Sequence, residues 1–146
     1  MPRILLIAFV LLLGTPRSSA VVNAEPTFVV IVNGKNGARA LDRKTLTDMF
    51  LKKRTLWGDD AAIQPVDQAR NAQVRKQFSE QVLGRTVSAV RTYWNRLVFS
   101  GRGVPPPELA TDDDVVKYVA KNRGAIGYVM GSVNLKDAGV RVIEVR

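Results

Sequence analysis

Residues 27–32 have the sequence TFVVIV, an almost unbroken run of β-branched and aromatic side chains. Such a run predicts a strand that is buried on both faces, as is usual in parallel α/β sheets. The turn-forming segment NGKNG at residues 33–37 ends the run. We therefore expect a buried strand here, within a sheet that is flanked by helices.

The rest of the chain alternates between helical and strand patterns. Four helices are expected, and they begin after Asp42, at Asn71, near Ser88 and at Asp112. Three more strands are expected, at residues 63–66, 125–129 and 140–145. This order favours a layered α/β domain with a mixed sheet of about four to five strands flanked by helices.

An acidic cluster, Asp112–Asp114, opens the last expected helix. Acidic residues at the start of a helix and the basic Lys121 and Arg123 near its end both complement the helix dipole. A divalent-metal site would need a matching carboxylate elsewhere, and the sequence does not assign one. The cluster is therefore interpreted as a helix start, and no metal site is predicted.

Residues 1–24 have the three parts of a secretory signal: a basic start, the apolar run ILLIAFVLLL at 4–13, and small residues at the exit. A membrane-spanning helix would need roughly 20 apolar residues, about twice the length of this run. Cleavage is expected after Ala20 or after Ala24, and the pattern does not choose between them. The remaining single domain, within 25–146, is expected in the periplasm with no membrane span after processing.

The composition excludes several kinds of chemistry, because the 146-residue chain contains no His and no Cys. Ser-His-Asp and Cys-His catalysis both need these residues, and so do the common zinc and copper sites. No nucleophile–base pair or pair of carboxylates suited to hydrolysis is evident. We therefore expect that the protein is not an enzyme and needs no cofactor.

The charge balance favours anionic partners. The chain has 22 Lys and Arg against 13 Asp and Glu, a net charge of +9. Such an excess attracts phosphate-bearing ligands, acidic proteins or a lipid surface, although solubilising charge scattered over helix faces explains it equally well. Nucleic acid is not expected as a partner, because the chain carries an export signal and no known nucleic-acid-binding motif.

Three segments resemble the phosphate-binding-protein-like family, the type 2 periplasmic solute-binding proteins of ABC transporters. The segments are IVNGKNGARALDRKTLTDMFLKKRTLWGD at 31–59, QFSEQVLG at 77–84 and VVKYVAKNRGAIGYV at 115–129. A strand ending in Asn, a helix running into Phe-Leu-x-Lys-x-x-x-Trp, and a helix closing with Gly-Ala-Ile-Gly-Tyr-Val are typical of that family. The resemblance implies a periplasmic-binding-protein-like α/β fold and a phosphate or related oxyanion as the ligand.

The sequence departs from this family in two respects. Family members have two lobes that hold the oxyanion between them, whereas this chain is long enough for a single lobe. The phosphate-binding members also place a basic residue and a Ser-Gly-Thr segment at the start of a helix. Here the corresponding positions are Gln68 and Ala72-Gln73-Val74, so the hydroxyls that would donate hydrogen bonds to phosphate are missing. Arg70 and Arg75 lie nearby and are candidates to compensate.

The candidate ligand site lies where two expected strands end. In open α/β sheets, ligands bind outside the carboxyl ends of the strands, and a helix N-terminus there offers N–H groups to an anion. An arginine adds a planar set of donors for a bidentate contact. The candidate ligand-binding residues are Asn33, Asn36, Asp67, Gln68, Arg70, Asn71 and Gln73. Alternatively, Asn33 and Asp67 are turn residues, Asn71 is a helix cap, and Arg70 is solvated.

The sequence leaves two functions open. One is an exported solute-binding-like protein for phosphate or a related oxyanion, linked to an ABC transport system. The other is an envelope protein–protein interaction module that retains the lobe without a ligand and binds a transporter, receptor or sensor protein. A homodimer, in which two single lobes form the cleft, is a third arrangement.

Overall fold

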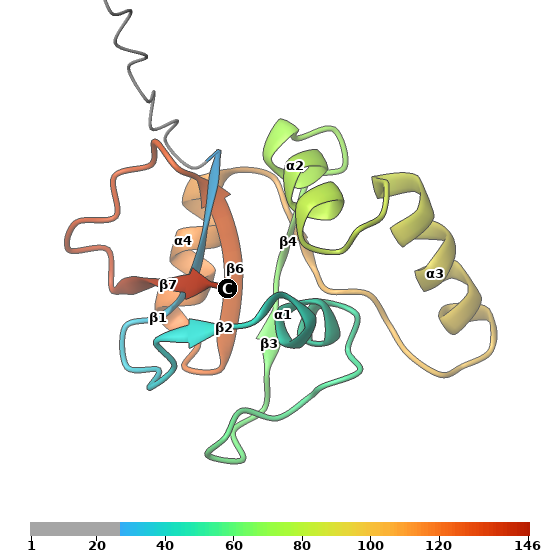
Figure 1. The fold of residues 1–146 in the computed structure, drawn as a ribbon, viewed down its shortest axis with the longest axis horizontal. Helices are drawn as coiled ribbons and strands as arrows, with labels where there is room; N and C mark the ends of the chain where they lie inside the picture. The colour runs from blue at the N-terminus through green and yellow to red at the C-terminus, as the bar shows by residue number, and fades with distance from the viewer. Residues whose placement is uncertain (1–26) are drawn as a thin grey trace, which may run out of the picture.

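The computed structural model describes residues 27–146, which form a five-stranded mixed sheet, a two-stranded sheet and four helices (Figure 1). The predicted signal peptide lies outside these residues. The elements are β1 (Phe28–Asn33), β2 (Ala40–Leu41), α1 (Arg43–Phe50), β3 (Gln64–Pro65), β4 (Asp67–Gln68), α2 (Gln73–Gln81), α3 (Val87–Phe99), β5 (Glu108–Leu109), α4 (Asp112–Lys121), β6 (Ala125–Met130) and β7 (Val140–Val145). The predicted mixed α/β architecture is confirmed.

The main sheet has the strand order β2-β7-β1-β6-β3. Its central strand β1 is antiparallel to both neighbours, with Val30 opposite Tyr128 on β6 and Ile143 on β7. The expectation that β1 lies in a parallel arrangement is therefore wrong. Only the short edge strands β2 and β3 pair in parallel, with β7 and β6 respectively. The apolarity of β1 instead reflects its central position, because helices cover both faces of the sheet.

Two layers of helices cover the sheet, as Figure 1 shows. On one face, α4 places Val115 and Val119 against Ile31 of β1. On the other face, residues of α1 and α2 share an apolar cluster with Val30 and Val32, and α3 joins this cluster from its position against α2. The alternate side chains of β1 thus enter two different apolar clusters, which confirms that this strand is buried on both faces.

The ends of the helices differ in part from the sequence-based expectation. Asp42 caps α1, because its carboxylate accepts a hydrogen bond of 2.8 Å from the backbone N–H of Thr45. Asn71 does not cap α2. The Ala72 N–H bonds to the Ala69 carbonyl, and this turn makes Ala72 the N-cap, without a side-chain cap bond. Thr86 caps α3, which begins one residue before the expected Ser88.

Three short strands, β2, β4 and β5, were absent from the sequence-based expectation. The segment after β3 continues into β4, which pairs in parallel with β5 from the proline-rich loop. Each strand has only two residues, too few to show an alternating apolar pattern. This pairing holds the carboxyl end of β4 against the start of α4. Within residues 27–146, no helix combines the length and the apolarity needed to cross a membrane.

Candidate functional site

The start of α2 lies next to most of the predicted ligand-binding residues. They divide into a buried set on β4 and an exposed set on the turn that enters α2. Asp67 and Gln68 are buried, with 7% and 2% of their surfaces exposed. Arg70, Asn71 and Gln73 are exposed. The two sets lie within seven consecutive residues, but they have different partners.

Asp67 is the centre of a buried polar network. Its carboxylate forms a salt bridge of 2.9 Å with the guanidinium of Arg75, which is itself buried. The same carboxylate accepts hydrogen bonds from the Tyr128 hydroxyl and, at 2.9 Å, from the backbone N–H of Gln68. These contacts join β4 to α2 and to the central part of β6, so Asp67 holds three elements together.

Gln68 has a structural role in the same network. Its side-chain amide donates to the backbone carbonyl of Tyr128 at 3.1 Å and to the carboxylate of Asp112 at the start of α4. Its own backbone carbonyl accepts a bond of 2.6 Å from Arg75. A ligand that recruited Gln68 would have to break these bonds, and buried polar groups left without partners are costly.

Burial controls the protonation of this network. Burial raises the pKa of the Asp67 carboxyl above its ordinary value, although the nearby Arg75 charge and the Tyr128 hydrogen bond act in the opposite direction. Burial and the adjacent Asp67 charge raise the pKa of Tyr128. The Tyr128 hydroxyl therefore remains a hydrogen-bond donor at neutral pH.

Arg75 does not compensate for the missing phosphate-binding groups. Besides Asp67, it contacts the Glu108 carboxylate of β5 at 3.0 Å, and its side chain is only 5% exposed. Two carboxylates thus neutralise one buried guanidinium. The expectation that Arg75 is available to an anion is wrong, because both terminal nitrogens of its buried guanidinium bond within the fold and the unpaired Nε is itself buried.

Asn33 and Asn36 lie apart from the other predicted site residues. The Asn33 amide donates to the carbonyls of Val119 and Ala120, at 2.9 and 2.8 Å, near the end of α4. The Asn36 side chain accepts from the backbone N–H of Ala38 within its own turn. Gln68, in contrast, contacts the first residue of α4, which is ten residues long, or about 15 Å.

The strand directions explain this separation. β1 is antiparallel to β6, and β6 is parallel to β3, so β1 and β3 run in opposite directions. Their carboxyl ends consequently lie at opposite edges of the sheet. The sequence-based argument placed both ends at one edge because it treated the strands as parallel.

The exposed residues line a pocket between the starts of α2 and α3, which we call the α2–α3 pocket. Its volume is about 420 Å³. Its walls are formed by Arg70, Asn71, Ala72, Gln73, Lys76, Glu80, Thr86, Val87 and Ser88. Sequence reasoning missed Lys76, Thr86 and Ser88. Lys76 follows Gln73 by three residues and therefore lies on the same helix face, which was the available signal.

The electrostatics of the α2–α3 pocket suit an anion. Two helix N-termini meet there, and the first turn of each helix leaves backbone N–H groups without an intrahelical acceptor. Arg70 and Lys76 add two positive charges, although Arg70 also contacts Glu108 at 3.3 Å. Glu80 is the one acidic side chain among the described residues that line the pocket. The arrangement can bind a small oxyanion by charge and backbone donors.

A second pocket lies on the other side of Gln73 and has a volume of about 380 Å³. Its walls include Gln68, Thr111 and Asp112. No Lys or Arg is among the described residues that line it. The Thr111 hydroxyl is already engaged with Asp114, at 2.7 Å from its carboxylate. This pocket is therefore less suited to an anion than the α2–α3 pocket.

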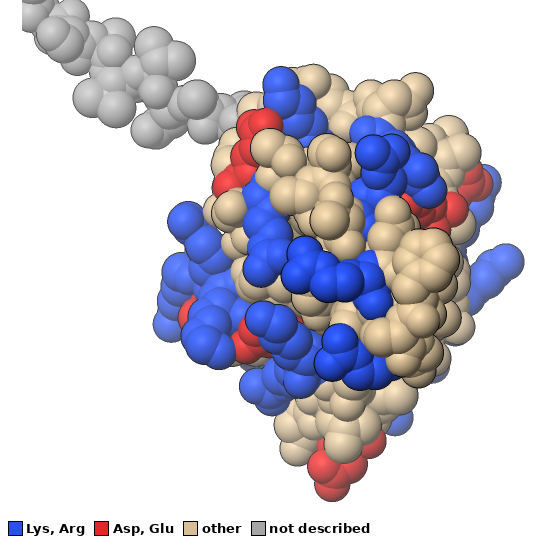
Figure 2. All heavy atoms as spheres, turned by 90° about the vertical axis from the view of Figure 1, so that its right-hand side faces the viewer, with Lys and Arg blue, Asp and Glu red and all other residues tan. Residues whose placement is uncertain are grey.

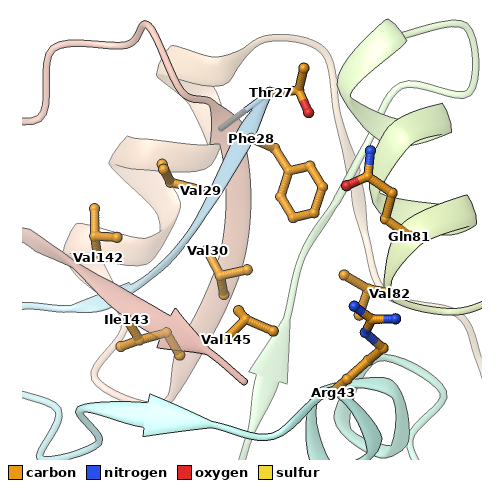
Figure 3. Close-up of a pocket in the computed structure, with 10 residues that line it drawn as sticks. All are labelled: Thr27, Phe28, Val29, Val30, Arg43, Gln81, Val82, Val142, Ile143 and Val145. Carbon is orange, nitrogen blue, oxygen red and sulfur yellow. The ribbon is translucent and has the colours of Figure 1, made fainter. Parts of the chain in front are cut away.

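A third pocket, of about 380 Å³, is largely apolar and lies over the sheet near the end of α2 (Figure 3). Phe28 and Val30 of β1 and Val145 of β7 form its floor, and Arg43 and Gln81 lie at its rim. Gln81 and Val82 lie at the carboxyl end of α2, so this pocket adjoins that end of the helix. Most of its lining is apolar, and Arg43 is the only Lys or Arg among the described residues that line it.

Metal binding finds no support in the part of the chain that the structure describes, where no group of three acidic, His or Cys residues is placed to hold an ion. The Asp112–Asp114 cluster opens α4 and its Thr111 cap accepts from the Asp114 N–H, as expected for a helix start. The sequence-based interpretation of this cluster as a helix start is confirmed.

Several solved structures have a similar fold. One is a structure with bound phosphate from Clostridium perfringens, described as a candidate phosphate ABC transporter substrate-binding protein, with a TM-score of 0.63 and 20% identity. Others are an ABC-type phosphate transport receptor from Vibrio cholerae (TM-score 0.61, 21% identity) and PstS from Borrelia burgdorferi (0.63, 11%). The fold is that of one periplasmic-binding-protein lobe.

The match covers 82% of this chain but only 44%, 46% and 47% of those three structures. The chain thus spans less than half the length of the proteins it resembles, which agrees with the expectation of a single lobe. No protein-family model and no curated protein matches the sequence. The resemblance inferred from the sequence is confirmed at the level of the fold.

The segment Ala72-Gln73-Val74, which stands where the resemblance implies Ser-Gly-Thr, lies at the start of α2. Ala72, Gln73 and Val74 form the N-cap and the first two residues of α2. The backbone N–H groups of a helix start are therefore retained, and the hydroxyls are not. Any anion bound here depends on backbone donors and on the charges of Arg70 and Lys76.

Proposed function

We propose that this chain is an exported, single-lobe solute-binding-like protein of the periplasm that binds phosphate or a related oxyanion in the α2–α3 pocket. In this proposal it serves an ABC transport system and catalyses no reaction. The structural neighbours named for phosphate transport support the proposal at the level of the fold. The export signal predicted at residues 1–24 supports the location.

One observation carries the proposal: two helix N-termini and two basic side chains line a single pocket. The α2 start contributes the N–H group of Gln73, and the α3 start contributes those of Val87 and Ser88. Arg70 and Lys76 add long-range attraction. Helix starts bind phosphate and sulfate in many unrelated folds by this combination of dipole and free N–H groups.

The pocket also limits the affinity. Arg70 has 61% of its side chain exposed, and Lys76 is exposed as well. Charge contacts in water are worth only about 0.2–1 kcal/mol each, because solvent screens them. A second copy of the chain, as in the predicted homodimer, would cover the pocket and strengthen these contacts. A monomeric profile in sedimentation velocity, with phosphate present, would argue against that arrangement.

The test is isothermal titration of phosphate into the exported protein in low-salt buffer, with sulfate as a second anion. Low salt matters because the Debye length shortens from ~30 Å at 0.01 M to ~8 Å at physiological ionic strength. We expect saturable binding that weakens as salt is added. No heat up to millimolar phosphate would contradict the proposal.

Paired variants locate the site. Arg70→Ala combined with Lys76→Ala should weaken binding by about five- to twenty-fold, because two exposed charge contacts are lost. Lys117→Ala combined with Lys121→Ala is the matched control. It removes the same charge from α4, on the opposite face of the sheet. Equal losses in the two pairs would mean that net charge, rather than the pocket, attracts the anion.

The alternative function is an envelope interaction module that retains the lobe without a ligand. The buried network favours it, because Asp67, Gln68 and Arg75 are all committed to internal contacts. In that case the exposed basic residues contact a transporter, receptor or sensor protein. Absence of phosphate and sulfate binding in the titration would favour this alternative.

A further inference from the structure

The stretch around α3 has a one-sided charge distribution. Between Glu80 and Glu108 the chain contains four arginines and no acidic residue. The arginines are Arg85, Arg91, Arg96 and Arg102, and all four are exposed. None forms a salt bridge within residues 27–146. This helix therefore presents uncompensated positive charge to its surroundings.

The carboxyl end of the same helix exposes apolar side chains. Phe99 is 91% exposed, and Val98 and Val104 are 49% and 64% exposed. Arg96 precedes Phe99 by one helical turn, and Arg102 follows in the next turn of chain. We call Arg96, Val98, Phe99, Arg102 and Val104 the α3 tip. Large aromatic side chains are rarely left this exposed without a partner.

An ordered turn fixes the α3 tip. Gly101 has a φ of +66°, in the left-handed region that glycine tolerates. Its N–H donates to the Val98 carbonyl at 3.0 Å, and the Arg102 N–H donates to the Leu97 carbonyl at 2.9 Å. This bonding pattern is a Schellman motif. It ends the helix after Phe99, with Ser100 as the C-cap, and the Phe99 side chain remains exposed.

The position of α3 leaves the tip accessible. Figure 1 shows α3 at the edge of the molecule, on the side away from the sheet. Its inner face packs through Val90 and Trp94, and Tyr93 donates to the Leu51 carbonyl at 2.9 Å. Figure 2, which views that side directly, shows Lys and Arg side chains gathered across the face, with few acidic ones among them.

We propose that the α3 tip is a membrane-contacting surface, which inserts Phe99 into the interface of an anionic lipid bilayer while the arginines bind the lipid phosphates. Interfacial binding of this kind combines a basic polar face with an aromatic or aliphatic side chain that enters the headgroup region. Arginine suits the role because its planar guanidinium pairs with phosphate in a bidentate manner.

The shape and the charge of the tip favour a bilayer over an acidic protein. The apolar atoms project from the end of a helix, so a protein partner would need a cavity that matches Phe99. A bilayer needs none, because lipids rearrange around an inserted side chain. The arginines surround the projection on both sides along the chain, which suits a continuous anionic surface. The tip is also at the opposite end of α3 from the α2–α3 pocket, so the two proposals fail independently.

Cosedimentation of the exported protein with vesicles tests the proposal. The vesicles are phosphatidylcholine alone or phosphatidylcholine with phosphatidylglycerol at three to one. We expect binding to the anionic vesicles only, with loss of binding at high salt. No binding to anionic vesicles at low salt would overturn the proposal, and an acidic protein would then be the better partner. Equal binding to both vesicle types would also overturn it, since arginine–phosphate recognition predicts a lipid-charge dependence.

Variants separate the tip from general charge attraction. Phe99→Ser should weaken anionic-vesicle binding by roughly ten-fold. The pair Arg96→Ala with Arg102→Ala should weaken it by about 25-fold, at about five-fold for each arginine lost. Lys117→Ala with Lys121→Ala, on α4, is the matched control and should have a much smaller effect. An unchanged affinity for Phe99→Ser, or an equal loss in the control pair, would overturn insertion by the tip. Far-UV circular dichroism verifies that each variant is folded.

Discussion

Asp67 and Gln68 differ sharply from Arg70, Asn71 and Gln73, although all five lie within seven residues of chain. The first two are buried and engaged with Arg75, Tyr128 and Asp112. The other three are exposed and line the α2–α3 pocket. The polypeptide turns outward at Ala69, where β4 has ended and α2 has not yet begun.

This difference shows how a buried polar network can fix the position of an exposed turn. The buried network ties β4, α2, β5 and β6 together, and it thereby fixes where the exposed turn leaves the sheet. Polar residue types alone do not distinguish the two roles, because an aspartate or a glutamine suits either. Changes in the network should therefore alter stability, whereas changes in the exposed set should alter anion binding and leave the fold intact.

The largest expected effect is on stability. Arg75→Met removes the cation from beside Asp67, and breaking a buried pair from one side typically costs about 3–5 kcal/mol. Burial already raises the pKa of Asp67, and loss of the Arg75 charge should raise it further. When the pKa of a group is higher in the folded state than in the unfolded state, the free energy of unfolding falls as the pH rises through the folded-state pKa. Urea denaturation should therefore show a larger loss at pH 8 than at pH 5.

A second substitution checks that assignment. Adding Asp67→Asn to Arg75→Met removes the unpaired carboxylate, so the double variant should recover part of the lost stability at pH 8. A double variant that is less stable than Arg75→Met at pH 8 would show that the carboxylate is held mainly by its hydrogen bonds rather than by the ion pair.

Tyr128→Phe should have the next largest effect. The phenol donates to the Asp67 carboxylate, and a hydrogen bond to a charged group contributes about 1.5–3 kcal/mol. The ring stacks on Phe78 with centroids 3.9 Å apart, and phenylalanine keeps this packing. The free energy of unfolding, measured by urea titration, should fall while the far-UV circular dichroism stays unchanged. An unaltered free energy would mean that Asp67 does not need this donor.

The two helix starts at the pocket provide a matched pair. Thr86 caps α3 through a bond of 3.1 Å from the Ala89 N–H, so Thr86→Ala should cost about 1 kcal/mol. Asn71 is exposed and does not cap α2, so Asn71→Ala should change stability by no more than about 0.5 kcal/mol. Thermal denaturation of both variants measures the difference. Equal losses would restore the earlier expectation that Asn71 is a cap.

The smallest expected effect concerns the one acidic side chain in the pocket wall. Glu80→Gln removes a negative charge from the α2–α3 pocket, so phosphate should bind roughly two- to five-fold more tightly at low salt. The gain should disappear at high salt, because the interaction is exposed and screened. Isothermal titration detects both changes. Weaker binding would mean that Glu80 contacts the ligand or positions Lys76.

The sequence predicted the layers and most elements of this lobe because long apolar runs carry that information. TFVVIV identified the buried strand β1, and the spacing of Val74, Phe78 and Val82 identified α2. The sequence contains no comparable pattern that indicates whether neighbouring strands are parallel or antiparallel. Asn33 was therefore placed beside Asp67, although the antiparallel pairing of β1 with β6 separates them.

The lining of the α2–α3 pocket was predicted in part, for a different physical reason. Arg70, Asn71 and Gln73 were identified because a helix start after a strand is a recurrent anion site. Thr86 and Ser88 were not, since nothing in a single sequence shows that the start of α3 meets the start of α2. Their proximity depends on the packing of Val90 and Trp94 against the core, which is a tertiary contact.

The most direct test of the account is amide chemical-shift mapping by ¹H–¹⁵N NMR during a phosphate titration at low salt. The account predicts saturable shifts centred on the backbone N–H groups of Gln73, Val87 and Ser88, with little change at Asn33 and Asn36. Saturable shifts centred on Asn33 and Asn36 instead, or no saturable shifts at all, would contradict binding in the α2–α3 pocket.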